Sequence, residues 1–214
     1  MSGHKHTLLI DRPDVSNATL VLAHGAGAPM DSPFMGKMAG LLVERGLTVV
    51  RFEFAYMAAR RLGPKKPPAP RAEMVVPEYR VALETAAIEG PVFIGGKSMG
   101  GRIATYLLAE LYEAGRIKGG ICLGYPFHPT AKPENVRTGH LETLAAPLLI
   151  VQGERDPFGT KQEVSGYSLG SGVELCWLPD GDHDFGPRGA SGHTRAQNLA
   201  RAADAVADFV RRHG

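Results

Sequence analysis

Short apolar runs alternate along the chain with longer segments whose apolar residues recur at helical spacing. Such runs are typical of strands that are buried on both faces, because neither face then needs polar residues. They are predicted at residues 7–10, 18–23, 47–54, 91–94, 119–123, 148–151 and 173–178. Helices are predicted at residues 33–46, 78–88, 99–114, 160–169 and 193–212. The alternation predicts an α/β fold with a mostly parallel central sheet and helices on both faces.

Two stretches fall outside this alternation. Residues 125–145 have an irregular pattern, and residues 59–71 are rich in proline and in basic side chains. A basic stretch of this kind is more often a solvated loop than a binding site, and its members are Arg60, Arg61, Lys65, Lys66 and Arg71. Because the pattern shows neither an internal repeat nor a change of composition, we expect one domain over residues 1–214.

The composition favours a globular protein that works outside the membrane. Of the 214 residues, 43% are hydrophobic and 21% are charged, and the formal net charge is +2. This balance argues against a dedicated nucleic-acid-binding protein, which needs concentrated positive charge. No apolar run approaches the roughly 18 residues that suggest a membrane span, and the polar start lacks the apolar segment of a signal peptide. Two cysteines, Cys122 and Cys176, make no disulfide framework, so we expect a soluble cytoplasmic protein.

The strongest functional signal follows the strand predicted at 91–94. Gly96, Ser98 and Gly100 form the pattern G-x-S-x-G between a strand and a helix, which is the context of a nucleophile elbow. Such a turn strains the serine backbone and brings the strand close to the helix, so glycine is needed two residues to either side. The serine oxygen then projects at the edge of the sheet, where the backbone N–H of Met99 can bind a developing oxyanion.

Two other kinds of site find little support. Gly96-Lys97-Ser98 looks like the end of a phosphate-binding loop, but Pro91 stands where that loop requires its first glycine. The pair His4 and His6 at the start of the chain is weak evidence for a metal site, and no other cluster has the spacing of metal ligands. We therefore expect neither a bound nucleotide nor a metal ion.

A serine nucleophile needs a base, and the base needs an acid that orients it. In this kind of fold the acid and then the histidine follow the serine in the chain, each in a loop after a strand. Asp156 lies just beyond the strand at 148–151, with Glu154 as a less favoured alternative, and His183 lies beyond the last strand. We predict that Ser98, Asp156 and His183 form a catalytic triad. The simpler alternative is a turn aspartate and a surface histidine.

The loop after the strand at 18–23 is predicted to complete the site. His24 is followed by Gly25, Ala26 and Gly27, whose small size lets the backbone approach a bound carbonyl group. We predict that the N–H of Ala26 is the second oxyanion donor, with Gly25 and Gly27 as near alternatives that border the substrate. His24 is expected to brace this loop. An apolar lining is expected from side chains that could equally belong to the core, namely Met30, Met57, Tyr125 and Phe127.

These features, in this order, resemble the α/β-hydrolases over nearly the whole chain. The strings HGAGAPMDSPFM (24–35), GGKSMGGR (95–102), LGYPFHP (123–129) and VQGERDPFG (151–159) are similar to a small, lid-poor, dienelactone-hydrolase-like branch. That branch includes bacterial proteins, a testis-expressed animal protein and a subunit of a chromatin-modifying complex. The resemblance implies hydrolysis of carboxylic esters or related acyl bonds without a cofactor. It also leaves a non-catalytic interaction protein as the alternative, because the branch contains members with scaffold roles.

Two features set this chain apart within the family. The segment between Tyr125 and Pro147 is short where larger relatives insert a lid domain, so we expect an open, shallow site for a small acyl substrate. Lys97 stands directly before the serine, where a histidine or an aromatic residue is commoner. We expect its ammonium group to pair with a nearby acid rather than to attract an anionic substrate. The acyl group, the leaving group and the oligomeric state are left open.

Overall fold

A computed structural model describes residues 7–64 and 66–214 of the chain. It contains a seven-stranded sheet with the order β1-β3-β2-β4-β5-β6-β7. Neighbouring strands are parallel except for β1, which runs antiparallel to β3 at one edge. The strands are β1 (Leu8–Asp11), β2 (Ala18–Ala23), β3 (Leu47–Phe52), β4 (Val92–Lys97), β5 (Gly119–Leu123), β6 (Leu148–Gly153) and β7 (Val173–Leu178). The predicted α/β fold with a mostly parallel sheet is confirmed.

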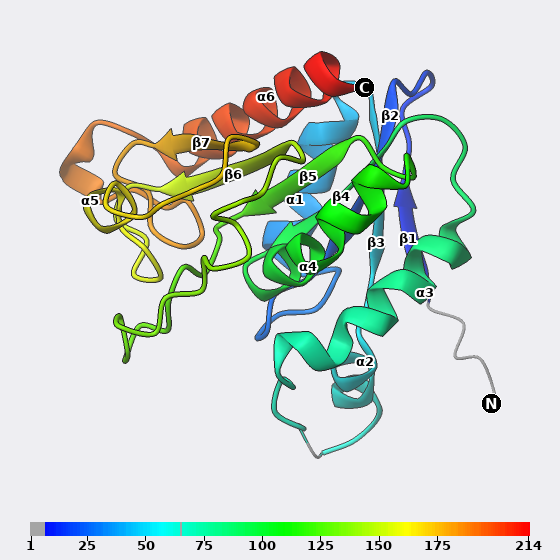
Figure 1. The fold of residues 1–214 in the computed structure, drawn as a ribbon, viewed down its shortest axis with the longest axis horizontal. Coiled ribbons are helices and arrows are strands. Elements are labelled where there is room, and N and C mark those ends of the chain that lie inside the picture. The colour runs from blue at the N-terminus through cyan, green and yellow to red at the C-terminus, as the bar shows by residue number, and fades with distance from the viewer. Residues whose placement is uncertain (1–6, 65) are drawn as a thin grey trace.

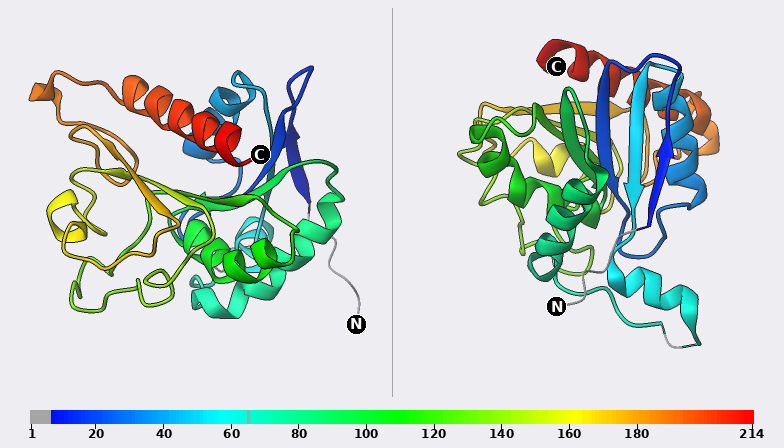
Figure 2. Two further views of the ribbon diagram at one scale, coloured as in Figure 1. Left: turned by 45° about the horizontal axis from the view of Figure 1, so that its top comes forward. Right: turned by 90° about the vertical axis from the view of Figure 1, so that its right-hand side faces the viewer.

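Helices cover both faces of the sheet (Figure 1). They are α1 (Pro33–Val43), α2 (Ala55–Leu62), α3 (Val76–Ala86), α4 (Met99–Glu113), α5 (Lys161–Val164) and α6 (Arg195–His213), with short 3-10 turns at Ala72–Val75 and Gly189–Ser191. Figure 2 shows α1 and α6 together on one face, and α3 and α4 on the other. Because the sheet is covered twice, β2, β3, β5 and β6 are buried at every position, which explains why most of their residues are apolar.

Each face of the sheet has its own apolar core. Phe34 of α1 and Phe209 of α6 belong to the first core, and Leu107 of α4 and Tyr79 of α3 belong to the second. Tyr79 is fully buried, and its hydroxyl lies 2.8 Å from both the N–H and the carbonyl oxygen of Gly95 in β4. Packing on this face therefore also holds the strand that leads into the predicted elbow.

The strand predicted at 91–94 is longer than expected. It continues to Lys97, because Gly95 and Gly96 pair in register with Leu22 and Ala23 of β2. Two glycines weaken a strand on their own, but a central position in a parallel sheet supplies hydrogen bonds on both sides. The turn between strand and helix is therefore reduced to Ser98.

Two helical segments also differ from their predictions. Helix α2 was not predicted, because two turns show no repeating stripe and a proline-rich stretch follows directly. It forms because Tyr56 and Met57 bury one of its faces. The helix predicted at 160–169 is confined to Lys161–Val164, since Gly166 follows so closely that the helix ends after one turn.

The segment 124–147 between β5 and β6 contains turns but neither helix nor strand. The prediction that no lid domain is inserted here is confirmed. The loops after β2, β4, β5, β6 and β7 meet at the carboxyl edge of the parallel strands, which is where α/β proteins place their sites. Among the helices described, none has both the length and the apolar character needed to cross a bilayer.

Candidate active site

Ser98 forms the turn between β4 and α4 with a backbone that side chains rarely adopt. Its φ is +52° and its ψ is −118°, a combination that costs free energy and persists only where neighbours enforce it. The N–H of Ser98 donates to the carbonyl of Leu123 in β5 at 3.1 Å, and its own carbonyl accepts from the N–H of Arg102 at 3.1 Å. The adjacent strand and the first turn of α4 thus hold the strained turn that the motif predicts.

The glycines of the motif are required by close backbone contacts. A Cβ atom on Gly96 would lie 2.5 Å from the carbonyl oxygen of Ala23, and one on Gly100 would lie 2.5 Å from the same oxygen. Neither position has room for a side chain, because the clashing atoms belong to the backbone of β2. The sequence motif therefore encodes the tight passage of α4 over the end of β2.

Asp156 and His183 come from the loops after β6 and β7, and their side chains meet. His183 Nδ1 lies 2.8 Å from Asp156 Oδ2, with the carboxylate fully buried and the imidazole 21% exposed. Two further donors satisfy the carboxylate: the N–H of Phe158 at 2.9 Å and the amide of Gln152 at 3.0 Å. Because a carboxylate can only accept, Nδ1 carries the proton and Nε2 has a free lone pair.

Gln152 was missed by the sequence prediction. It is fully buried; its Oε1 accepts from the N–H of Tyr125 at 2.7 Å, and its Nε2 donates to the Tyr125 carbonyl at 3.1 Å. The signal was present, since Gln152 is a polar residue in the apolar strand LLIVQG and buried polar groups need partners. Glu154, the alternative acid, is engaged elsewhere, with Lys161 Nζ at 2.8 Å and the N–H of Asp180 at 3.0 Å.

Ser98 and His183 both border the turn that follows β5. Leu123 accepts the N–H of Ser98, and a Cβ atom on the next residue, Gly124, would lie 3.3 Å from His183 Cε1. In the part of the chain that the structure describes, the Ser98 hydroxyl makes no hydrogen bond. The structure therefore joins the predicted acid to the predicted base and brings base and serine to one turn, with no direct Ser98–His183 hydrogen bond.

The loop after β2 lies against the elbow, as a second oxyanion donor would require. A Cβ atom on Gly25 would lie 3.7 Å from Ser98 Cβ. Gly25 is buried, Ala26 is half-buried and Gly27 is exposed. The hydroxyl of Tyr56 lies 3.3 Å from the carbonyl oxygens of both Gly25 and Ala26. Helix α2, which carries Tyr56, thereby holds this loop beside the elbow.

His24 braces the same loop, as predicted. It is fully buried; its Nε2 accepts from the N–H of Phe54 at 3.1 Å, and its Nδ1 lies 2.7 Å from the carbonyl oxygen of Gly25. The proton is therefore on Nδ1. Burial lowers the pKa of His24, which keeps the ring neutral and both nitrogens in use.

Lys97 places a buried ammonium group beside the predicted base. Its Nζ donates to the carbonyl oxygen of His183 at 2.7 Å and lies 3.3 Å from Asp184 Oδ1. It also lies 5.2 Å from the centre of the Phe34 ring. Burial lowers the pKa of Lys97, and the negative charge of Asp184 opposes that shift. The expected pairing with a nearby acid is confirmed.

Comparison with known protein families identifies the family to which the chain belongs. A family model described as an alpha/beta hydrolase domain matches residues 16–211. The chain belongs to the α/β-hydrolase family. The match spans β2 to α6 and therefore includes every residue predicted for the site.

Solved structures agree with this assignment at the level of the fold. A dienelactone hydrolase from Anabaena variabilis has a TM-score of 0.71 at 18% identity, over 98% of this chain and 99% of that one. An alpha-beta serine hydrolase homologue from Coxiella burnetii has a TM-score of 0.68 at 20% identity, over 97% and 91%. A lid-free serine hydrolase from Xanthomonas campestris has a TM-score of 0.65 at 21% identity, over 96% and 88%.

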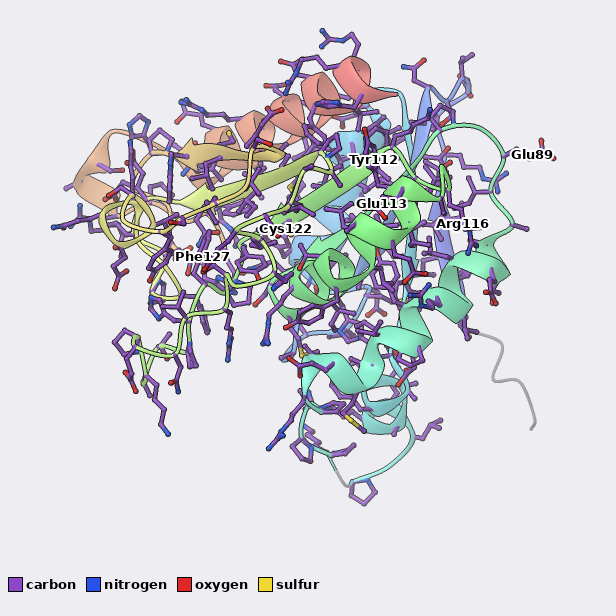
Figure 3. All side chains as sticks on the ribbon, viewed as in Figure 1. Glu89, Tyr112, Glu113, Arg116, Cys122 and Phe127 are labelled. Atoms are coloured by element: carbon purple, nitrogen blue, oxygen red, sulfur yellow. The ribbon has the colours of Figure 1, made fainter. Side chains whose placement is uncertain are left out.

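The apolar lining expected for this α/β-hydrolase requires a correction. Tyr125 and Phe127 are fully buried, with ring centres 4.9 Å apart, and Figure 3 labels Phe127 in the segment after β5. The Tyr125 hydroxyl donates to the carbonyl of Arg137 at 2.8 Å, which closes the segment over both rings. Met30 and Met57 are only 6% and 3% exposed. These side chains are therefore buried residues of the core, the alternative that the sequence left open, rather than an accessible lining.

Two arginines of the predicted basic stretch, Arg60 and Arg61, are engaged within the fold. Arg60 donates to the carbonyl of Ala26 at 3.1 Å, and Arg61 donates to Glu53 Oε2 at 2.8 Å and Asp31 Oδ2 at 3.1 Å. Lys65 of the same stretch lies outside the described residues, as do His4 and His6. Over residues 7–64 and 66–214, no group of three or more His, Cys, Asp or Glu side chains is arranged to hold a metal ion.

Proposed function

We propose that this α/β-hydrolase is a serine hydrolase that cleaves carboxylic esters or related acyl bonds. Ser98 is the nucleophile, His183 the general base and Asp156 the acid that orients it. The observation that carries the proposal is the strained turn at Ser98, with φ of +52°, beside a buried Asp156 whose Oδ2 lies 2.8 Å from His183 Nδ1. Strain of this kind is typical of functional sites, and a buried carboxylate paired with a partly exposed imidazole is typical of a base.

The reaction follows from the roles of these groups. His183 Nε2 takes the hydroxyl proton as Ser98 Oγ attacks the acyl carbon, and Asp156 stabilises the imidazolium that forms. The negative charge that develops on the acyl oxygen is bound by the N–H groups of Met99 and Ala26. His183 returns its proton to the leaving group, and then activates the water that releases the acid and regenerates Ser98.

The proposal also covers the substrate, the domain organisation and the cellular compartment. The substrate is a small acyl compound that binds in an open, shallow site, since residues 124–147 carry no helix that would cover it and Gly25 and Gly27 have no side chains that would obstruct it. The chain forms a single domain of the branch related to the testis-expressed protein and the chromatin-complex subunit. Both cysteines, Cys122 and Cys176, are free thiols, which fits the reducing cytoplasm.

Labelling with a fluorophosphonate probe tests the proposal directly, because the probe reacts with an activated serine. We expect the wild-type protein to be labelled and the Ser98→Ala variant not to be. Ser165→Ala, which alters an exposed serine, is the matched control and is expected to retain labelling. Hydrolysis of p-nitrophenyl esters should fall by on the order of 10⁴-fold or more in Ser98→Ala.

Two results would contradict the proposal. Labelling that persists in Ser98→Ala excludes Ser98 as the nucleophile. Well-folded wild-type protein that neither reacts with the probe nor hydrolyses a panel of esters favours the alternative, a non-catalytic interaction protein on a hydrolase fold.

A further inference from the structure

Lys97 brings a buried ammonium group to the site, although the predicted triad requires no cation there. It is the last residue of β4, in register with Leu123 of β5, and its side chain is only 8% exposed. Burying an ammonium group is costly unless hydrogen bonds and an opposite charge compensate it. The partners of Lys97 therefore indicate what this buried charge does.

The principal partner of Lys97 is the backbone of the predicted base. Its Nζ donates to the carbonyl oxygen of His183 at 2.7 Å, whereas Asp184 Oδ1 lies at 3.3 Å. The Asp184 side chain is 60% exposed, so water competes for its carboxylate and weakens the ion pair. The Lys97 side chain is only 8% exposed, so little water reaches its ammonium group to compete with the hydrogen bond to the His183 carbonyl.

The turn after β5 passes directly beside this hydrogen bond. A Cβ atom on Gly124 would lie 3.1 Å from Lys97 Nζ and 3.1 Å from the His183 carbonyl oxygen. Gly124 itself has a φ of +72°, a backbone conformation that favours glycine. Glycine is therefore preferred at this point of the turn both for its conformation and for the space it leaves to the two partners. The turn therefore borders both the ammonium group and the carbonyl oxygen on one side.

We propose that Lys97 is a positioning residue that fixes the backbone of His183 relative to Ser98, its own neighbour in the chain. His183 is then held at two points, through its ring by Asp156 and through its carbonyl by Lys97. The inference rests on the proposed function, because it concerns the distance between base and nucleophile. A misplacement of about 1 Å between reacting groups can cost on the order of 10²-fold in rate.

The Lys97→Met variant tests this role, because methionine keeps the length of the apolar stem and removes the donor. The substitution leaves the carbonyl oxygen of His183 without its donor, and a buried acceptor left unsatisfied destabilises the fold, so we expect a lower melting temperature and compare the kinetics well below it. We expect kcat to fall on the order of 10- to 100-fold with KM little changed, and probe labelling of Ser98 to slow in parallel. Lys97→Arg keeps a cationic donor and should retain more of kcat than Lys97→Met.

Asp184→Asn is the matched control, since it removes the ion pair and leaves the hydrogen bond to the His183 carbonyl. We expect it to change kcat by less than about fivefold. Amide hydrogen exchange over residues 180–186 supplies a readout that does not depend on hydrolysis. Exchange should be faster in Lys97→Met than in the wild type and in Asp184→Asn.

The possible failures are distinguishable. A folded Lys97→Met variant with wild-type kcat, or with unchanged exchange over residues 180–186, overturns the positioning role and leaves the proposed function intact. Wild-type protein without probe labelling and without ester hydrolysis overturns the proposed function and the catalytic part of this inference. If Lys97→Met does not fold, a loss of kcat far above fivefold in Asp184→Asn overturns the inference instead, because the ion pair with Asp184 and not the hydrogen bond to the His183 carbonyl would then control the rate.

Discussion

Two histidines follow strands at the same edge of the sheet, and the structure holds them in opposite ways. His24, after β2, is fully buried, and both ring nitrogens are used by backbone groups of Gly25 and Phe54. His183, after β7, is 21% exposed and has a carboxylate on Nδ1. Its Nε2 makes no hydrogen bond to any residue in the described ranges.

This difference separates a structural histidine from a potential base. Protonating His24 would place two N–H groups against each other, because Nε2 already accepts from Phe54, and the lowered pKa reflects its burial. Protonating Nε2 of His183 breaks no existing hydrogen bond, and the carboxylate of Asp156 compensates the new charge. A free nitrogen and an adjacent carboxylate, rather than the residue type or its place at the sheet edge, therefore define the candidate base.

The comparison is tested most strongly by His183→Ala. We expect kcat for ester hydrolysis to fall by about 10⁴-fold, because no other group can take the proton of Ser98. The melting temperature should fall moderately, since the buried Asp156 carboxylate loses one donor and keeps those from Phe158 and Gln152. Hydrolysis close to the wild-type rate would show that His183 is not the base.

Gln152→Leu should have the next largest effect, on both activity and stability. It removes a donor to Asp156 and leaves the buried N–H of Tyr125 without its acceptor. Each buried group left unsatisfied costs about 1–3 kcal/mol, so urea unfolding should show a loss of that order, and kcat should also fall. Gln162→Leu, at an exposed position of α5, is the control. Equal stability of the two variants would contradict the role given to Gln152.

His24→Leu is expected to act on the fold more than on the chemistry. The substitution leaves the Phe54 N–H without its acceptor and removes one of the two donors to the Gly25 carbonyl, where the Tyr56 hydroxyl remains. We expect a cost of about 1–3 kcal/mol in the free energy of unfolding. The loss of kcat should be far smaller than for His183→Ala. His193→Leu, at an exposed site, controls for the change of residue type. A kcat loss as large as that of His183→Ala, with normal stability, would reverse the comparison.

The smallest expected effect is a pH dependence of stability from neutral histidines. Burial lowers the pKa of His140 from 6.5 to about 4, and it also lowers the pKa of His24. Between pH 6.5 and about 4 the unfolded chain therefore binds more protons, so stability falls as the pH falls through this window and is fully present above it. Because His140 is only half-buried, its share is on the order of 1 kcal/mol.

Urea unfolding on either side of this window measures the effect. In His140→Asn the free energy of unfolding should depend less on pH than in the wild type. The pH dependence that remains should come from His24. A free energy of unfolding that rises as the pH falls would contradict the neutral state assigned to both rings.

Local rules explain which parts of the site could be predicted. The pattern Gly96-x-Ser98-x-Gly100 was informative because part of the crowding is local: a Cβ atom on Gly96 would lie 2.6 Å from the carbonyl carbon of Gly100, at the start of the helix that follows. Asp156 and His183 were predicted from chain order, which the connectivity of the sheet imposes. Whether Tyr125 and Phe127 line the site or fill the core was left open by the sequence, because that choice depends on what covers the side chain, and both are fully buried in the fold.

By itself, the sequence determined the alternation of strands and helices, the position of the elbow and the order of the candidate triad, because these follow from periodicity and from contacts between near neighbours. Only the tertiary structure decided which groups meet across distant segments. Gln152 orients Asp156, Phe54 occupies the second nitrogen of His24, and Lys97 holds the carbonyl of His183. The physical reason is that hydrogen bonds between loops depend on how the sheet brings the loop ends together, which no local pattern encodes.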